Sequence, residues 1–407
     1  MDGLDPVVAR APDSTGGPPQ APRALPNAES ARPRSLWIWG RWIDLSVFGG
    51  SAALALVLVG LSSLLADEGG SLPPWGWLIF VVAVDVAHVH TTLFRTYFDR
   101  DELRRRRALY IAVPIACYAA GLALHLVSHL AFWRALAYLA VLHFIRQQIG
   151  WVAIYRARAG ERSKLDRWLD DVVIYFATGW PLLHWHASPP RSFRWFIEGD
   201  FVALPLLEGI VRPLGAVYLA LLLAYAARSI LLASRGRPVN TGKHVVVATT
   251  AATWYVGIVA TNTDFQFTVA NVIVHGVPYM ALLFAYARER SREAPGVLSS
   301  RIVTFGLTAF LGVALALAFA EEVLWDRLVW HDRPFWFGGG DRDAPLLGPL
   351  ARALIVPLLA LPQATHYALD AVLWRRRDTG AAQARALGFR GPPPSQPADN
   401  TGAPAPT

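Results

Sequence analysis

The chain has 407 residues, of which 54% are hydrophobic and 17% are charged. A soluble domain carries nearer a quarter charged residues, and the apolar residues here fall into blocks long enough to cross a bilayer as helices. The net charge of +8 would suggest nucleic acid for a soluble protein, but the arginines border apolar segments, so we expect no nucleic-acid partner. Cys117 is the only cysteine, which excludes an intramolecular disulfide and a thiolate metal cluster.

The apolar stretches predict an all-α, polytopic integral membrane helix bundle of about ten transmembrane helices. In chain order, the expected spans are 45–66, 76–98, 108–130, 132–155, 171–187, 206–233, 245–262, 264–287, 302–322 and 349–374. They form one expected transmembrane domain, residues 36–377. Residues 1–35 and 378–407 are polar and rich in proline, which predicts two disordered cytoplasmic tails that are dispensable for folding.

The basic residues of the loops alternate along the chain. The loops after the even-numbered spans hold the excess, at 104–107, 156–167, 235–243, 288–301 and 375–377. The opposite loop 67–75 and the turn 261–263 have no basic residue. Because short cytoplasmic loops carry the arginine and lysine excess, we predict an inner (plasma) membrane protein with both termini in the cytoplasm.

Four of the expected spans carry ionisable side chains together with other polar residues, at spacings that favour one helix face. These residues are Asp85, His88 and His90 on the second span, His143, Arg146 and Gln147 on the fourth, Asn271 and His275 on the eighth, and Gln363, His366 and Asp370 on the tenth. Thr92 and Tyr279 continue two of these stripes. Ionisable groups are costly in hydrocarbon, so they usually face the protein interior and mark function.

Four of these histidines share a depth in the membrane. The separations from the arginine that ends each span are twelve residues from His88 to Arg100, thirteen from His143 to Arg156, thirteen from His275 to Arg288 and nine from His366 to Arg375. At a rise of about 1.5 Å per residue, all four lie roughly 14–20 Å from that boundary. We therefore expect them to converge within about a dozen Å, as ligands of a metal ion. His90 lies about 200° around the helix from His88, so we expect His88 to face the cluster.

The donor set indicates the chemistry of this site. Imidazole suits iron, zinc and copper, and iron oxygenase sites mix it with carboxylate. Asp85 and Asp370 are the candidate carboxylates, as ligands or as acceptors for the second ring nitrogen of a ligating histidine. Arg146 stays charged, so it needs either one of these carboxylates or the anionic head group of a substrate. We expect His90, Gln147, Asn271 and Gln363 to surround the ligands.

The remaining polar residues lie nearer the outer side. His125 and His129 are one helical turn apart near the outer end of the third span, and His184 and His186 lie near the outer end of the fifth. They could form a second, shallower site. We expect the Glu321–Glu322 pair to be interfacial.

Several strings in the spans resemble an uncharacterised family of bacterial multi-pass, histidine-bearing membrane proteins. They are AHVHTTLFRTYFD (87–99), HFIRQQIGW (143–151), WYVGIV (254–259), HGVPYMAL (275–282) and THYALDAVLW (365–374). The resemblance covers roughly residues 40–375 and supplies no activity. The HxxHH boxes of membrane fatty-acid desaturases do not occur here, because no two histidines are adjacent.

These patterns predict a membrane metalloenzyme, an iron-dependent oxidoreductase or oxygenase. Its expected partners are membrane lipid and an apolar or amphipathic small molecule, such as a lipid or isoprenoid-like substrate, because a buried metal can act in a site that the bilayer keeps dry. A transporter or proton-coupled carrier with a polar site at the midplane is the first alternative. A haem-binding electron-transfer protein with paired axial histidines is the second.

The alternation of arginines generates a topology prediction. In a background with Cys117→Ala, single cysteines placed in the loops 99–107, 156–170, 234–244 and 288–301 should resist an impermeant maleimide in intact cells and react after lysis. A cysteine in the loop 67–75 should react from outside and serves as the positive control. External labelling of the loop 99–107 would contradict the proposed orientation.

Overall fold

The computed structural model describes residues 35–338, 347–374 and 380–389, and the regular elements in these ranges are all helices. Six helical stretches are long and apolar enough to cross a membrane. They are Arg41–Gly60, Glu68–Arg95, Arg107–Val127, Pro205–Ser234, Asp264–Glu293 and Leu307–Trp330. The predicted all-helical class is confirmed, whereas the count of ten spans stays a prediction.

The first two apolar stretches are built from short pieces that differ in winding. Arg41–Gly60 consists of α1 (Arg41–Asp44), η1 (Leu45–Gly50) and α2 (Ser51–Gly60), and α3 (Ser62–Leu65) follows it. Glu68–Arg95 consists of η2 (Glu68–Gly70), α4 (Pro74–Gly76), η3 (Trp77–Val86), α5 (Ala87–Thr91) and η4 (Thr92–Arg95). Its winding changes from π-type in η3 to α in α5 and to 3₁₀ in η4.

The other apolar stretches are more regular. They comprise α7 (Arg107–Val127), α10 (Glu208–Ser234), α12 (Asp264–Glu293), and α14 (Leu307–Trp325) with η7 (Asp326–Trp330). The remaining four expected spans are also helical but are not among the six apolar stretches. They correspond to α8 (His129–Ala159), α9 (Lys164–Ala187), α11 (Thr241–Trp254) with η6 (Tyr255–Ala260), and α16 (Pro349–Leu359) with α17 (Leu361–Leu373). Short helices connect or flank them: α6 (Arg100–Arg105), η5 (Pro205–Leu207), α13 (Leu298–Thr304), α15 (Pro334–Phe337) and α18 (Ala381–Ala386).

Polar side chains fix where several long helices begin. Ser128 accepts a hydrogen bond from the backbone N–H of Ala131 at the start of α8, and Ser163 does the same for α9. Asn240 caps α11 and Thr263 caps α12. The first N–H groups of a helix have no partner within the helix, and these oxygens supply one.

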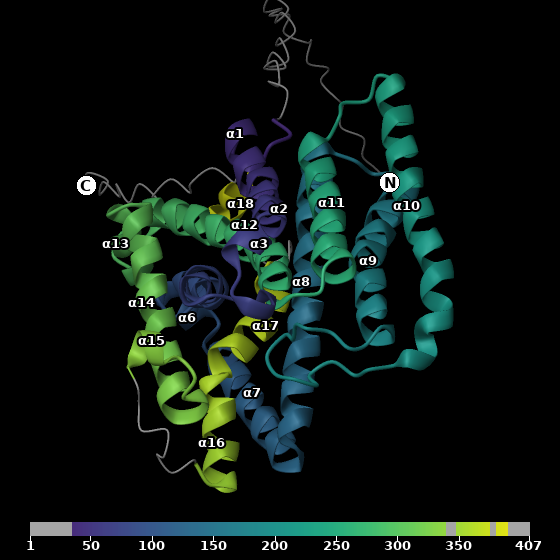
Figure 1. Ribbon diagram of the computed structural model, residues 1–407. Coiled ribbons are helices and arrows are strands. Elements are labelled where there is room, and N and C mark those ends of the chain that lie inside the picture. Colours follow the sequence, from purple (N-terminus) through teal and green to yellow (C-terminus); the bar gives the residue numbers. More distant parts are fainter. Residues whose placement is uncertain (1–34, 339–346, 375–379, 390–407) are drawn as a thin grey trace, which may run out of the picture. The chain divides into compact units, whose positions relative to one another are not determined.

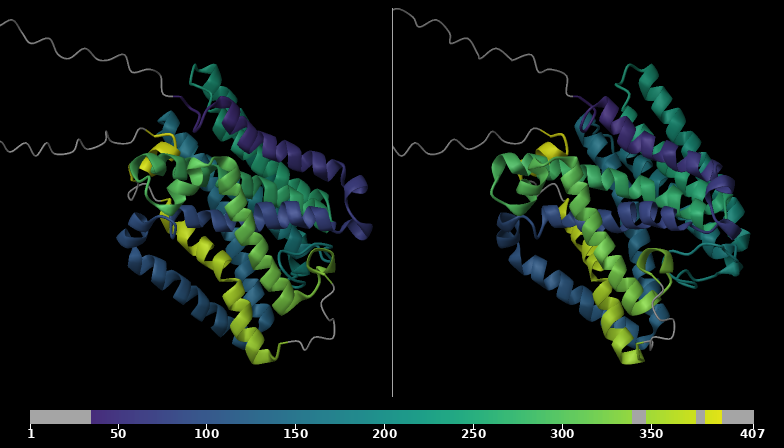
Figure 2. Two further views of the ribbon diagram at one scale, coloured as in Figure 1. Left: turned by 90° about the vertical axis from the view of Figure 1, so that its left-hand side faces the viewer. Right: turned by 60° about the vertical axis from the view of Figure 1, so that its left-hand side comes forward.

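The helix α12 lies at the centre of the packing (Figures 1 and 2). Its most apolar stretch is 72% buried, that of Glu68–Arg95 is 56% buried, and the other four are 33% buried or less. It packs against α2, η3, α5, α11 and α13. On another side of the bundle, α7 packs against α8, α16 and α17. The two most buried of the six apolar stretches therefore carry His275 and His88 into the interior.

Ion pairs join the loops that carry the basic residues. Arg290 binds Asp99 with a 2.6 Å contact between Nε and Oδ2, and Lys243 Nζ lies 2.6 Å from an oxygen of Glu161. Asp99 is buried and also caps α6. The basic residues that predict topology therefore also hold neighbouring helix ends together.

The structure differs from the expected boundary of the second tail. Residues 380–389 lie inside the stretch 378–407, yet α18 forms there and packs against α12 through Tyr286, Ala382 and Ala386. The buried Arg95 donates a 2.6 Å hydrogen bond to Gln383 Oε1. A sequence rich in alanine but without an apolar stretch gave no sign of this contact. Residues 1–34, 378–379 and 390–407 of the expected tails lie outside the described residues, as do residues 375–377 at the end of the expected transmembrane domain.

This contact predicts two different outcomes for truncation at the C-terminus. Removing residues 390–407 should leave the thermal stability in detergent near wild type. Removing residues 380–407 takes away Gln383, one of the acceptors for Arg95, and a hydrogen bond to a charged group contributes about 1.5–3 kcal/mol. We expect a clearly lower melting temperature for the shorter chain and a smaller decrease for Gln383→Ala in the full chain. Equal melting temperatures for all these chains would show that α18 contributes nothing.

Candidate metal centre

Four buried histidines meet in the interior. His88 comes from α5, His143 from α8, His275 from α12 and His366 from α17. One ring nitrogen from each lies within 4.8 Å of those of the others. The predicted convergence is therefore confirmed, and the choice of His88 over His90 with it.

The distances within the cluster fit a metal ion. The Nε2 atoms of His275 and His88 are 3.2 Å apart, and so are those of His366 and His143. Four nitrogens at 2.0–2.1 Å from a tetrahedral metal would lie about 3.3 Å from one another. The cluster is close to that geometry in these two pairs and somewhat wider overall.

The second ring nitrogens of three histidines face polar partners. His366 Nδ1 lies 2.7 Å from Thr92 Oγ1, which favours the tautomer that leaves Nε2 free to bind a metal. His143 Nδ1 lies 3.6 Å from Asp370 Oδ2, and His88 Nδ1 lies 3.7 Å from Asp85 Oδ1. These two distances exceed those of hydrogen bonds but place a carboxylate behind each ring, as is common for ligating histidines.

The ring of His275 is held differently. It stacks on Phe144 with ring centroids 3.5 Å apart and an interplanar angle of 10°. Its Nδ1 has no hydrogen-bond partner among the described residues. The Gln147 side chain donates to the backbone carbonyl of His275 over 3.3 Å. An aromatic face, a neighbouring amide and the helix backbone therefore orient this imidazole.

Asp370 is fixed by two donors. Tyr279 donates its hydroxyl to Oδ1 over 3.0 Å, and Trp374 Nε1 donates to the same oxygen over 2.6 Å. The hydroxyl of Tyr279 is also 3.1 Å from Thr92 Oγ1. This connects Asp370, Tyr279, Thr92 and His366 in one network beneath the cluster. Thr92 and Tyr279 each lie four residues after a histidine of the cluster, so helical spacing could have identified them as site residues, whereas apolar Phe144 gave no signal.

His90 faces away from the four histidines. Its Nε2 lies 2.8 Å from Glu321 Oε2, and that carboxylate also accepts a hydrogen bond from Trp325. Glu321 is buried, with 7% of its surface exposed. The imidazole and the indole supply the partners that let Glu321 lie inside the protein, and the expected interfacial position of the Glu321–Glu322 pair stays a prediction.

Among the described residues, two others that we expected near the ligands, Asn271 and Gln363, form no hydrogen bond with the four imidazoles. Asn271 is buried one turn before His275 and donates to the carbonyl of Phe267 over 2.8 Å. Gln363 is half-buried, and no side-chain hydrogen bond of Gln363 is recorded within the described residues. Among the amides that sequence placed around the site, Gln147 is the one recorded in contact with a site residue.

Arg146 is placed differently from the expected ion pair. Its side chain is exposed. Within the described residues, Arg146 forms no ion pair with Asp85 or with Asp370. Arg146 follows His143 by three residues, which rotates it about 60° around α8. That rotation takes it out of the buried cluster and into a neighbouring groove.

The groove has a volume of about 930 Å³ and runs between α7, α8 and α17. His143, Tyr279 and Asp370 line it, so it reaches the histidine cluster. Its walls are mostly apolar, and Arg146 and Asp370 are the charged residues of the lining. The groove therefore meets the cluster at one of its four histidines, His143.

The outer histidine pairs do not form a second site. His129 Nδ1 lies 3.1 Å from His125 Nε2. His184 contacts Arg191 instead, and His186 Nε2 lies 2.8 Å from the hydroxyl of Tyr138. Within the described part of the chain, the four buried histidines are the one group of three or more potential metal-binding side chains. The expected shallower site is therefore not found there.

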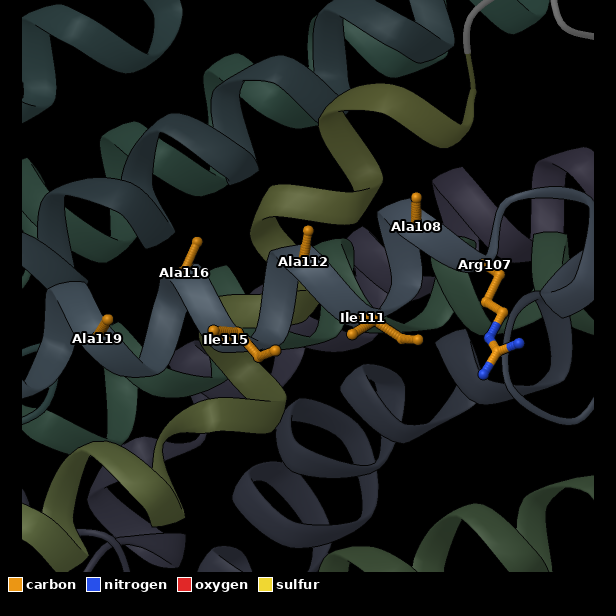
Figure 3. A pocket seen from close by; sticks show the side chains of 7 residues that line it. All are labelled: Arg107, Ala108, Ile111, Ala112, Ile115, Ala116 and Ala119. Carbon is orange, nitrogen blue, oxygen red and sulfur yellow. The ribbon is translucent and has the colours of Figure 1, made fainter.

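A second hollow, of about 720 Å³, lies along α7 (Figure 3). Its lining comes entirely from this helix, and Arg107 is the one charged member. It shares only Ala116 with the lining of the groove and includes none of the four histidines. We assign it no role in the metal centre.

Comparison of the chain with family models, curated proteins and solved structures gives no match. The chemistry of the site therefore rests on the geometry described above.

The close approach of α12 to η3 brings His275 to His88 and can be tested. Gly276 lies beside Val84, and a Cβ at this position would be 2.7 Å from Val84 Cγ1 and 3.0 Å from its carbonyl oxygen. Gly276→Ala should push the two helices apart and lower the metal content without removing a ligand. Gly312→Ala on α14 is the control, because a Cβ there meets nothing within 4 Å. Metal analysis of both purified variants measures the effect, and an unchanged metal content in Gly276→Ala would contradict it.

Proposed function

We propose that the protein is a membrane-embedded, metal-dependent enzyme, an iron-type oxidoreductase or oxygenase acting on a lipid or isoprenoid-like substrate. The observation that carries this proposal is the convergence of four buried imidazole nitrogens within 4.8 Å beside an apolar groove. In a purely structural role, each buried imidazole would need only hydrogen-bond partners on neighbouring helices. Such a role does not require all four imidazoles to converge on one point.

The donor set suits a transition metal. Neutral imidazoles suit iron, copper and zinc, and they leave the charge of a dication uncompensated. Asp85 and Asp370 lie 3.7 and 3.6 Å behind two of the rings and would supply that compensation. A bound iron would supply activation of dioxygen or polarisation of a substrate oxygen. His88, His143, His275 and His366 would hold it, and the groove beside His143 would admit the substrate.

The proposed location follows from the helices. We propose ten membrane spans in the inner (plasma) membrane with both termini in the cytoplasm. Six apolar stretches of sufficient length support this location, and the basic loops support the orientation. The four less apolar helices include α8 and α17, which carry site residues. Polar residues that face a site would explain their lower apolarity.

Two other functions fit the arrangement less well. A haem with two axial histidines needs its four equatorial positions for the porphyrin, and the other two imidazoles of the cluster would occupy that space. A proton-coupled carrier also uses a polar site at the midplane, and it requires no metal. Metal content therefore separates the carrier from the enzyme, and the absorption spectrum separates haem from non-haem iron.

Substitution of the ligands tests the metal site. His88→Ala and His366→Ala should each remove the bound metal from the purified full chain while the protein still elutes as a folded species. Asp370→Asn should weaken metal binding about 10–100-fold, as is usual for a partner of a ligating histidine. Metal analysis and metal titration measure these effects, with His125→Ala as a control outside the cluster. Unchanged metal content in all three variants, or a wild-type protein without metal, would favour the carrier or a structural cluster.

A further inference from the structure

The groove beside the cluster is long and is shaped by small side chains. Along α8 it extends from Phe132 to Ala157, which corresponds to roughly 37 Å of helix at 1.5 Å per residue. Eleven alanines and glycines line it: Ala116, Ala120, Gly121, Ala135, Gly150, Ala153, Ala157, Ala360, Ala364, Ala368 and Ala371. These short side chains on facing helices line a groove whose volume of about 930 Å³ is sufficient for a chain-like ligand.

Arg146 is the cation of this lining and lies near the middle of the groove. It is thirteen residues from the C-terminal end of α8 at Ala159 and seventeen from the N-terminal end at His129. Its guanidinium cannot lose its proton, and if α8 spans the membrane as proposed, this charge is costly unless an anion accompanies it. The described residues record no carboxylate within ion-pair distance of it.

Asp370, the carboxylate of the lining, is already occupied. Tyr279 and Trp374 donate to its Oδ1, and its Oδ2 faces His143. It therefore neither neutralises Arg146 nor offers a free acceptor to a ligand. A ligand that complements the groove would therefore carry one anionic group beside Arg146, and the rest of the ligand would be apolar.

We propose that the groove binds a long-chain amphiphile with a carboxylate head group, the head paired with Arg146 and the chain lying between α7, α8 and α17. A guanidinium binds a carboxylate through two parallel hydrogen bonds. One arginine balances the single charge of a carboxylate better than the two charges of a phosphate monoester. Arg146 is three residues from His143, a rise of about 4.5 Å, so the carbons near the head group lie beside the cluster.

That the amphiphile is a substrate rests on the proposed function, but its binding can be measured independently of the metal. The probes are the fluorescent fatty acid cis-parinaric acid and its methyl ester, titrated onto the purified full chain in nanodiscs. The wild-type protein should bind the acid at least about tenfold more tightly than the ester, the range expected for hydrogen bonds between charged groups. Arg146→Gln should remove that preference and leave ester binding unchanged.

Two further variants keep the test specific. Arg134→Gln is the matched control, because Arg134 lies on the same helix, does not line the groove and donates to the carbonyl of Gly199 over 3.0 Å. It should keep the wild-type preference. Arg146→Lys retains the positive charge and should keep part of it. A wild-type protein that binds acid and ester equally, or an Arg146→Gln protein that still prefers the acid, would overturn the proposal.

The metal content of the same samples separates the two proposals. Preference for the acid in a protein that holds no metal would leave the carboxylate site standing and remove the enzyme. A metal-loaded protein without any preference would remove the carboxylate site alone. Equal displacement of the acid by a soluble phosphate monoester and by a long-chain fatty acid would also overturn the assignment, because it would show that the chain and the carboxylate do not determine binding.

Discussion

The arrangement of the interior depends on the burial of four imidazoles at one point. A polar group removed from water without a partner is costly, so each histidine constrains the rotation and the axial position of its own helix. His88 and His275 fix α5 against α12, while His143 and His366 fix α8 against α17. These four helices come from distant parts of the chain, and the cluster therefore determines which helices are neighbours at the centre of the bundle.

The surrounding residues show how that constraint is met without crowding. Gly276 allows α12 to approach η3, and the network through Thr92, Tyr279 and Asp370 satisfies the hydroxyl and carboxylate groups beneath the rings. Glu321 and His90 satisfy each other on another side of α5. These polar groups are arranged in pairs and chains, which is the condition under which they are tolerated in a low-dielectric core, whereas Nδ1 of His88 and Nδ1 of His275 have no hydrogen-bond partner among the described residues. Most of the packing around them is apolar.

Much of the site could be predicted because depth and helical phase are properties of sequence. Similar distances from the terminal arginines, nine to thirteen residues, placed the four histidines in one layer, and the turn angle separated His88 from His90. The remaining features depend on packing between helices. Arg146 shares the stripe of His143, but only the position of α17 determines that it enters a groove. Phe144 is apolar and gave no sign of stacking on His275, and α18 is too short and too polar to be recognised before its contact with Arg95 is known.

Two positive charges at the centre would have to be compensated separately. The first concerns the cluster. Four neutral imidazoles would leave the charge of a bound dication uncompensated, and the carboxylates of Asp85 and Asp370 lie close enough to compensate for it. The second concerns Arg146, whose charge those carboxylates do not meet. If Asp370 had paired with Arg146, it would have been lost to His143, and no charge would face the groove. The donors from Tyr279 and Trp374 hold Asp370 on the side of the cluster, so under the two proposals Arg146 would be available to an anionic ligand and Asp370 to a bound metal.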